Sequence, residues 1–519
     1  MTKNRKHIEL FAGCGGMAVG MEAAGFELLF ANEVSPMASN TFASNLLDID
    51  ITKPNEKVKW VHSRYPKKSY EKRLRENLLS HNEDENCELI FEKDLSDLSG
   101  SLLVGDVRHL RNKLIEYNIN NPYEGELDLV SGGPPCQSFS LAGKRELENY
   151  KNRLPLDFAE ICEIIKPKVV LLENVKGILS AFRDGKKKYY AWFEVAKAFA
   201  QKGFAPVCML LNSKYYGIAQ NRPRYIMVAF REDIFYKVLE KYPENKILLK
   251  VASFYSKVHS DFDKLNLMDL DYYDIEKNTE LFDGYILPKP TTFNKETWIS
   301  VKDAIDDLIN VKCGKKSSYV NSINELFKSN FSSLDKIHNH NYRNHTDKIK
   351  KRFLFYQILN HANGLKESIL EKKKDNLVIA NDDIKKLYNE LKSTIKNFGS
   401  LFSSLMSFQK FIRDVSLTKK HSQRALVQTL PSPAQLTIPD DICHYSIFEN
   451  RVLTVREMAR IQSFPDWFIF KSKETTGGEN RSFEVPQYTQ VGNAVPPKLA
   501  YEIGSHINSL LNKIETNGL

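Results

Sequence analysis

The stretch KHIELFAGCGGMAVGMEAAGFELLFANE, residues 6–33, decides the fold. A short apolar run typical of a strand ends at a glycine cluster, a segment of helical composition follows, and a second apolar run ends at Glu33. Gly25 separates the helical segment from the second run, where glycine commonly closes a helix. The order of strand, glycine loop, helix and strand predicts the first unit of an α/β sheet.

The glycine loop has the spacing of a nucleoside-binding turn. Residues 13–18, GCGGMA, fit the pattern G-x-G-x-x-G/A, and Glu33 lies 20 residues after Gly13. Glycines let a ligand approach the backbone, and a carboxylate at the end of the second strand can bind both ribose hydroxyls. The pattern predicts a nucleoside-containing cofactor without separating NAD from S-adenosylmethionine. A glycine turn needed only for packing is the alternative.

Strand-like and helix-like segments continue to alternate to about residue 235. Further short apolar runs end at polar or glycine breaks, and an amphipathic segment, PLDFAEICEIIKP, lies between two of them. This rhythm predicts a doubly wound, mostly parallel sheet. Residues 50–100 interrupt it with a basic, aromatic stretch and then an acidic one, which we interpret as an insertion. A solvated helical lobe is a better interpretation of that insertion than a DNA contact.

Length and composition limit the classes of protein. A chain of 519 residues predicts two or more domains, one of which can be inserted in another. The sequence contains no run of about 18 apolar residues, so no membrane span is predicted. The first residues do not resemble a secretory signal. The seven cysteines include no CxxC pair, which favours a reducing compartment over disulfides or a zinc site. The histidines of HNHNYRNH, residues 338–345, lack a clean metal spacing, so no metal is expected.

One thiol stands in an unusual loop. GGPPCQSFS, residues 132–140, follows the apolar run ELDLVS, and Cys136 lies just past the end of that run. The next apolar run, PKVVLLENV, carries Glu173 near its end. If these strands are parallel neighbours, the thiol and the carboxyl share the sheet edge where open α/β sheets bind ligands. A free cysteine is usually a small buried hydrophobe, but the glycine and proline turn favours a presented nucleophile.

Such a pair suits chemistry on a pyrimidine ring. Cytosine C5 is a poor nucleophile, whereas a thiolate that adds to C6 creates an enamine able to attack an electrophilic methyl group. A protonated carboxyl near N3 stabilises the charge on the ring, and burial raises the pKa of that carboxyl. A base in a duplex has to be flipped out to reach the site.

Three further segments contain candidate ligand-binding residues. In QNRPR, residues 220–224, Arg222 and Arg224 are spaced to point the same way and could hold a phosphate or a pyrimidine O2, with a surface ion pair as the alternative. In GDV, residues 105–107, Asp106 could accept from an adenine amino group. QVGNAVPP, residues 490–497, fixes a loop before the last helix.

Together these segments resemble the DNA (cytosine-5) methyltransferase family of the bacterial restriction-modification type. The matching stretches, in the family's order, are LFAGCGG, NE at 32–33, GDV, GGPPCQSFS, ENV at 173–175, QNRPR, RVLTVREMARIQSFPD at 451–466 and QVGNAVPP. Glu9, where the family usually has aspartate, and Pro134, where phenylalanine is common, are departures that remove no catalytic group.

The resemblance implies roles for the matched positions. Cys136 would be the nucleophile and Glu173 the acid at N3, with Arg222 and Arg224 supporting the flipped base. Gln137 and Ser140 would lie near DNA on a mobile loop. Phe11 would lie against the adenine and Glu33 on the ribose. The expected S-adenosyl-L-methionine site comprises Phe11, Gly13, Gly15, Glu33, Asp106, Val107 and Asn493.

The family's fold implies a methyltransferase-type α/β domain with a smaller inserted target-recognition domain. We expect the catalytic domain at 1–310 plus 483–519 and the recognition domain at 311–482. The resemblance implies methyl transfer to C5 of cytosine in specific double-stranded DNA. A tRNA methyltransferase with the same chemistry is the alternative. We expect a cytoplasmic, nucleoid-associated monomer without metal or membrane attachment. The restriction-modification type of the family implies a cognate restriction endonuclease that acts separately.

Overall fold

The computed structural model describes most of the chain. Cys136, Gln137 and Ser140 lie outside the described residues, which are 5–80, 86–89, 95–117, 127–135, 153–184, 187–309, 314–328, 336–362, 364–375, 377–418 and 423–516.

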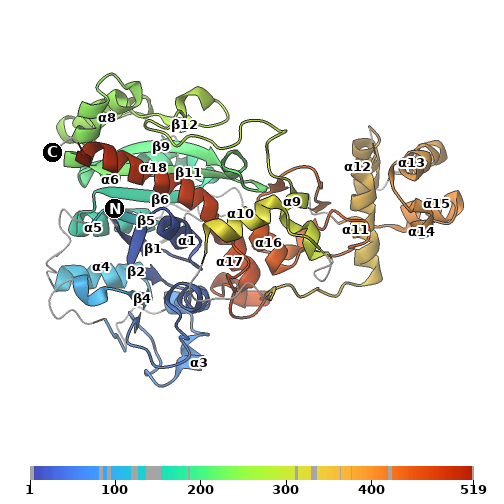
Figure 1. Ribbon diagram of the computed structural model, residues 1–519, viewed down its shortest axis with the longest axis horizontal. Helices are drawn as coiled ribbons and strands as arrows, with labels where there is room; N and C mark the ends of the chain where they lie inside the picture. The colour runs from blue at the N-terminus through green and yellow to red at the C-terminus, as the bar shows by residue number, and fades with distance from the viewer. Residues whose placement is uncertain are drawn as a thin grey trace.

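A nine-stranded sheet forms the centre of the larger part of the molecule (Figure 1). From edge to edge its order is β12 (Tyr272–Asp274), β9 (Phe204–Asn212), β11 (Pro223–Arg231), β6 (Val169–Val175), β5 (Leu129–Gly132), β1 (Arg5–Leu10), β2 (Phe26–Glu33), β4 (Ser101–Val104) and β3 (Val58–Trp60). Only β11 runs antiparallel to its neighbours, β6 and β9. The predicted doubly wound, mostly parallel sheet is confirmed.

The strand order creates a switch point beside β1. From β1 the chain builds the sheet outward through β2 and β4, and then returns to add β5 and β6 on the other side. Strands β1 and β5 pair in parallel, with Leu10 opposite Gly132, and β5 and β6 continue this register with Gly132 opposite Leu172. Loops after these strands therefore open at one sheet edge, where α/β proteins bind ligands.

Helices cover the sheet in two contacting groups. In one, α1 (Gly16–Ala23) packs along α18 (Pro497–Glu515), which also contacts α7 (Glu232–Lys241). In the other, α5 (Leu154–Ile165) contacts both α4 (Val107–Glu116) and α6 (Ala191–Gln201). The end of the chain thus completes the layer begun by its first helix, and Figure 1 shows α18 crossing the sheet.

Close packing of α1 on α18 depends on Gly20. A Cβ atom there would lie 2.3 Å from the Pro497 carbonyl oxygen and 2.5 Å from the Ala500 Cβ. We expect Gly20→Ala to lower the free energy of unfolding by about 1–3 kcal/mol, because the added methyl overpacks the interface. Gly399, in α14 (Phe398–Leu401), is the matched control, since a Cβ there meets nothing within 4 Å. Urea unfolding followed by circular dichroism measures both; equal stability of the two variants would contradict the prediction.

The 50–100 insertion differs from the solvated helical lobe expected for it. It supplies the edge strand β3, which pairs in parallel with β4. Its described part contains a single α-helix, the four-residue α3 (Tyr70–Arg73). Its apolar residues Trp60 and Leu78 are buried in a cluster with side chains of β2 and β4. The segment therefore forms an edge strand with buried apolar side chains, despite its high charge.

The chain between the sheet and α18 forms two further cores. One joins α9 (Val301–Ile305), α10 (Ser318–Leu326), α16 (Val455–Ile461) and α17 (Gln487–Asn493). The other lies in a helical lobe farther from the sheet (Figure 1), made by α11 (Asp347–Leu359), α12 (Lys366–Lys374), α13 (Asn381–Thr394), α14 and α15 (Leu405–Asp414). Within the described residues, no helix has the length and apolar character needed to span a membrane.

Candidate active site

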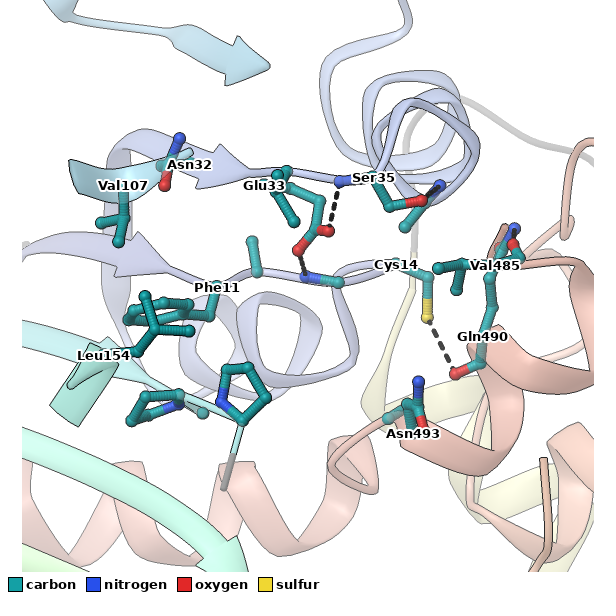
Figure 2. Close-up of a pocket in the computed structure, with 18 of the residues that line it drawn as sticks. Phe11, Cys14, Asn32, Glu33, Ser35, Val107, Leu154, Val485, Gln490 and Asn493 are labelled. Atoms are coloured by element: carbon teal, nitrogen blue, oxygen red, sulfur yellow. Dashed lines mark hydrogen bonds between the residues drawn. The ribbon is translucent and has the colours of Figure 1, made fainter. Parts of the chain in front are cut away.

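One cavity of about 440 Å³ opens at the carboxyl ends of β1, β2 and β6. This volume suits a ligand of nucleoside size or larger. It brings together most of the described residues predicted for the site: Phe11, Gly13, Glu33, Asp106, Val107, Glu173, Arg224 and Asn493. Figure 2 shows Phe11, Glu33, Val107 and Asn493 around it. Gly15 and Arg222, also described, do not line it.

The Glu33 carboxylate is fixed by two backbone donors, as Figure 2 shows. The N–H of Gly13 donates to Oε2 at 2.8 Å, and the N–H of Ser35 donates to Oε1 at 2.7 Å. Burial raises the pKa of Glu33, and the backbone hydrogen bonds oppose that rise. Each oxygen retains acceptor capacity, so a ligand's paired hydroxyls can bind here.

The loop after β1 has a left-handed backbone. Phe11 has φ 55° and Gly13 has φ 57°, a region that a side chain other than glycine's rarely occupies. The Phe11 ring meets Phe158 edge-to-face at 6.0 Å between centroids. A strained aromatic residue at a cavity wall is typical of a functional site. Gly15, with φ 98°, instead packs closely, because a Cβ there would lie 2.6 Å from Leu46 Cδ1.

Asp106 is the N-cap of α4, beside the strand that ends at Glu33. Its carboxylate accepts from the backbone N–H of Arg108 at 2.9 Å and pairs with the Arg108 guanidinium at 2.5 Å. Burial raises the pKa of Asp106, but the bonds and charge of Arg108 hold it below its usual value. The carboxylate therefore stays ionised and keeps its role as an acceptor, although Arg108 already uses part of that capacity.

Glu9 and Gln490 are among the cavity residues that were not predicted for the site. Glu9 is buried, and its Oε2 has no hydrogen-bond partner among the described residues. Burial, together with the nearby Glu22 and Glu33, raises its pKa well above the usual value. Gln490, in α17, joins that helix to α2 (Pro36–Phe42), since its Oε1 accepts from Thr41 Oγ1 at 2.6 Å. The motif QVGNAVPP contained the signal for Gln490, because it begins there.

Glu173 lies beside the loop that leads to Cys136. A Cβ atom at Gly133 would lie 3.1 Å from Glu173 Oε2, so the small residue lets the loop pass the carboxyl. Asn174 holds the same loop, because its Nδ2 donates to the Pro134 carbonyl at 2.9 Å. Pro134 and Pro135 line the cavity together with Glu173. The fold therefore places Pro135, the residue before Cys136, and the Glu173 carboxyl in the same cavity.

The Glu173 carboxyl faces Arg224. Its Oε1 lies 2.8 Å from Arg224 Nε, and each side chain is 11% exposed. Burial raises the pKa of Glu173, whereas the charges of Arg224 and Arg222 oppose this rise. The net direction is upward, which favours a protonated carboxyl more than in an ordinary glutamate.

Arg222 has different partners from Arg224. It is 1% exposed, and its guanidinium donates to the carbonyl oxygens of Gly492 at 2.7 Å and Ala494 at 3.2 Å. It thereby fastens the C-terminal end of α17, within the predicted loop motif QVGNAVPP, to the start of β11. Arg222 is buried, and the Arg224 side chain is 11% exposed and lines the cavity, so neither forms the surface ion pair that was the alternative. Their divergence arises because Arg222 precedes β11, whereas Arg224 lies within its paired part.

Within the described residues, no group of three His, Cys, Asp or Glu side chains could hold a metal ion. The described lining offers a buried acid, Glu173, the arginine Arg224 beside it, and Pro134 and Pro135, which precede Cys136 in the chain.

Comparison with known proteins gives one family. The family model for C-5 cytosine-specific DNA methylases matches residues 5–72 and 67–509. The chain is 24% identical to the type II methyltransferase M.DdeI of Desulfomicrobium norvegicum, over 96% of this chain and 88% of the relative. It is 25% identical to M.XorII of Xanthomonas oryzae pv. oryzae, over 98% and 85%. It is 24% identical to M.Eco47II of Escherichia coli, over 98% and 79%.

Proposed function

The chain belongs to the C-5 cytosine-specific DNA methylase family, and we propose that it methylates C5 of a cytosine in a specific double-stranded DNA sequence. The methyl group comes from S-adenosyl-L-methionine, the target base is flipped out of the duplex, and Cys136 bonds covalently to C6. We further propose that it is the modification enzyme of a restriction-modification system, as the names of the type II relatives suggest.

A single observation carries this proposal. One cavity joins Glu33, Asp106 and Phe11 to Glu173 and to Pro135, the residue before Cys136. A nucleoside-type site and a buried acid therefore open into the same space. Methyl transfer from a nucleoside cofactor to a ring carbon requires this proximity.

The lining fits S-adenosyl-L-methionine, which supplies an electrophilic methyl group when bound. Glu33 offers two anchored acceptor oxygens for ribose hydroxyls, and Phe11 offers an aromatic surface for adenine. Glu9 adds a buried carboxyl oxygen without a partner among the described residues, which a hydrogen-bond donor of the ligand can satisfy. No metal is needed for this chemistry.

The protein's own groups perform the remaining steps. The Cys136 thiolate adds to C6, and Glu173 donates a hydrogen bond or a proton at N3 as the ring gains electron density. C5 then forms its bond to the methyl group as the bond between that methyl and the cofactor sulfur breaks. Loss of the C5 proton to solvent, departure of the thiolate and return of any N3 proton to Glu173 restore the ring and the free cysteine. Arg224 holds the Glu173 carboxyl in position.

Purified protein incubated with methyl-labelled S-adenosyl-L-methionine tests the proposal on DNA and on tRNA. We expect label in DNA at C5 of cytosine, and bisulfite sequencing of that DNA would give the target sequence. Label in tRNA alone would overturn the DNA proposal in favour of a tRNA methyltransferase. Binding of S-adenosylhomocysteine, measured by calorimetry, reports separately on the cofactor site.

A further inference from the structure

The 50–100 insertion reaches the cavity described above. Its residues Glu76–Leu79 line that cavity together with Phe11 and Asp106. We propose that this segment, here called the 76–79 wall, is part of the cofactor site and that Leu79 packs against the nucleoside end of the ligand. The inference rests on the proposed function and assigns a binding role to the insertion.

The wall is fastened to the motif that carries Asp106. Nε2 of the His62 ring donates a hydrogen bond to the Leu78 carbonyl oxygen at 2.8 Å, because a carbonyl oxygen can only accept. A Cβ atom at Gly105 would lie 3.1 Å from His62 Nδ1, so the ring lies directly against the residue before Asp106. The rings of His62 and His109, of α4, lie 4.4 Å apart. The wall therefore borders the Asp106 end of the cavity.

Buried polar bonds hold the wall in one conformation. Glu76 is 7% exposed, and its carboxylate accepts from the Arg64 N–H at 2.7 Å and from Ser63 Oγ at 2.6 Å. Arg73 pairs with Glu88 at 2.6 Å, and its guanidinium lies 5.2 Å from the centre of the Trp60 ring. A segment fixed in this way binds a ligand without a large ordering cost.

Leu78 and Leu79 differ in their surroundings. Leu78 is 2% exposed and belongs to the core under β3. Leu79 is half-buried at the cavity. An apolar side chain that remains partly exposed at a ligand cavity loses its contact with water when an aromatic base covers it. Leu79 is therefore the side chain of the wall that contributes binding energy.

Leu79→Ala tests the inference by binding and kinetics. We expect S-adenosylhomocysteine to bind about tenfold more weakly, because part of a leucine's burial is lost. KM for S-adenosyl-L-methionine should rise by a similar factor while kcat at saturating cofactor stays unchanged. Leu79→Met should restore affinity. Leu74→Ala is the matched control, since Leu74 packs against the same core but does not line the cavity.

A second ligand shows which end of the cofactor Leu79 contacts. 5′-Methylthioadenosine lacks the amino-acid end, and we expect Leu79→Ala to weaken its binding by the same factor. Unchanged binding of both ligands, or a loss confined to S-adenosylhomocysteine, would overturn the assignment of Leu79 to the nucleoside. If the parent protein binds neither ligand, the proposed function itself fails, so the two failures are distinguishable.

Discussion

Cys136→Ser is expected to abolish methyl transfer while leaving cofactor binding intact. A serine hydroxyl is scarcely ionised near neutral pH, so it cannot replace the thiolate that activates the cytosine ring. We expect the rate to fall on the order of 10⁴-fold or more, as when a covalent nucleophile is removed. The measurement is transfer of labelled methyl groups to cognate DNA, with S-adenosylhomocysteine affinity measured in parallel by calorimetry.

Cys87→Ser is the matched control for this substitution, because Cys87 is half-buried in the insertion and does not line the cavity. It should methylate as the parent does. With 5-fluorocytosine at the target, the parent and Cys87→Ser should form a denaturant-stable adduct, since fluorine at C5 cannot leave as the proton does. Cys136→Ser should form none. An adduct with Cys136→Ser, or transfer within tenfold of the parent, would reject the covalent role.

The sheet could be predicted because its strands carry local signals. Each apolar run ends at a glycine or polar break, and the glycine loop with Glu33 predicts which strand end holds a ligand. The structure confirms the mostly parallel sheet and brings Glu33, Asp106 and Glu173 to one cavity. The proximity of Gly133 to Glu173 follows from parallel neighbours in register, which the sequence could only assume.

Features set by long-range packing could not be predicted in this way. Arg222 and Arg224 have equivalent spacing, yet one binds the carbonyl oxygens of 492–494 and the other faces Glu173. Which partner each meets depends on the return of a segment some 270 positions away in the sequence. The insertion likewise appeared solvated because its charges dominate its composition. Its Trp60 and Leu78 become core residues only because β3 pairs with β4, a strand outside the insertion.

Glu173→Gln has the second largest expected effect. The amide keeps the size of the side chain and can donate a hydrogen bond, but it cannot transfer a proton to N3. General acids contribute about 10²–10⁴-fold, so we expect kcat to fall within that range. Glu163→Gln, at a surface ion pair with Lys202, is the control and should retain parent activity. Circular dichroism and S-adenosylhomocysteine binding check that the fold and cofactor site of Glu173→Gln are intact.

The pH dependence of kcat separates an acid from a merely structural glutamate. Burial raises the pKa of Glu173 above its usual value despite the opposing charge of Arg224. The protonated, active fraction is therefore larger than for an ordinary glutamate, and it decreases as pH rises through the raised pKa. The parent should lose kcat along this alkaline limb. Because glutamine does not titrate, Glu173→Gln should lack the limb and show a lower, flatter profile. A limb retained in Glu173→Gln would assign the titration to another group and contradict the acid role of Glu173.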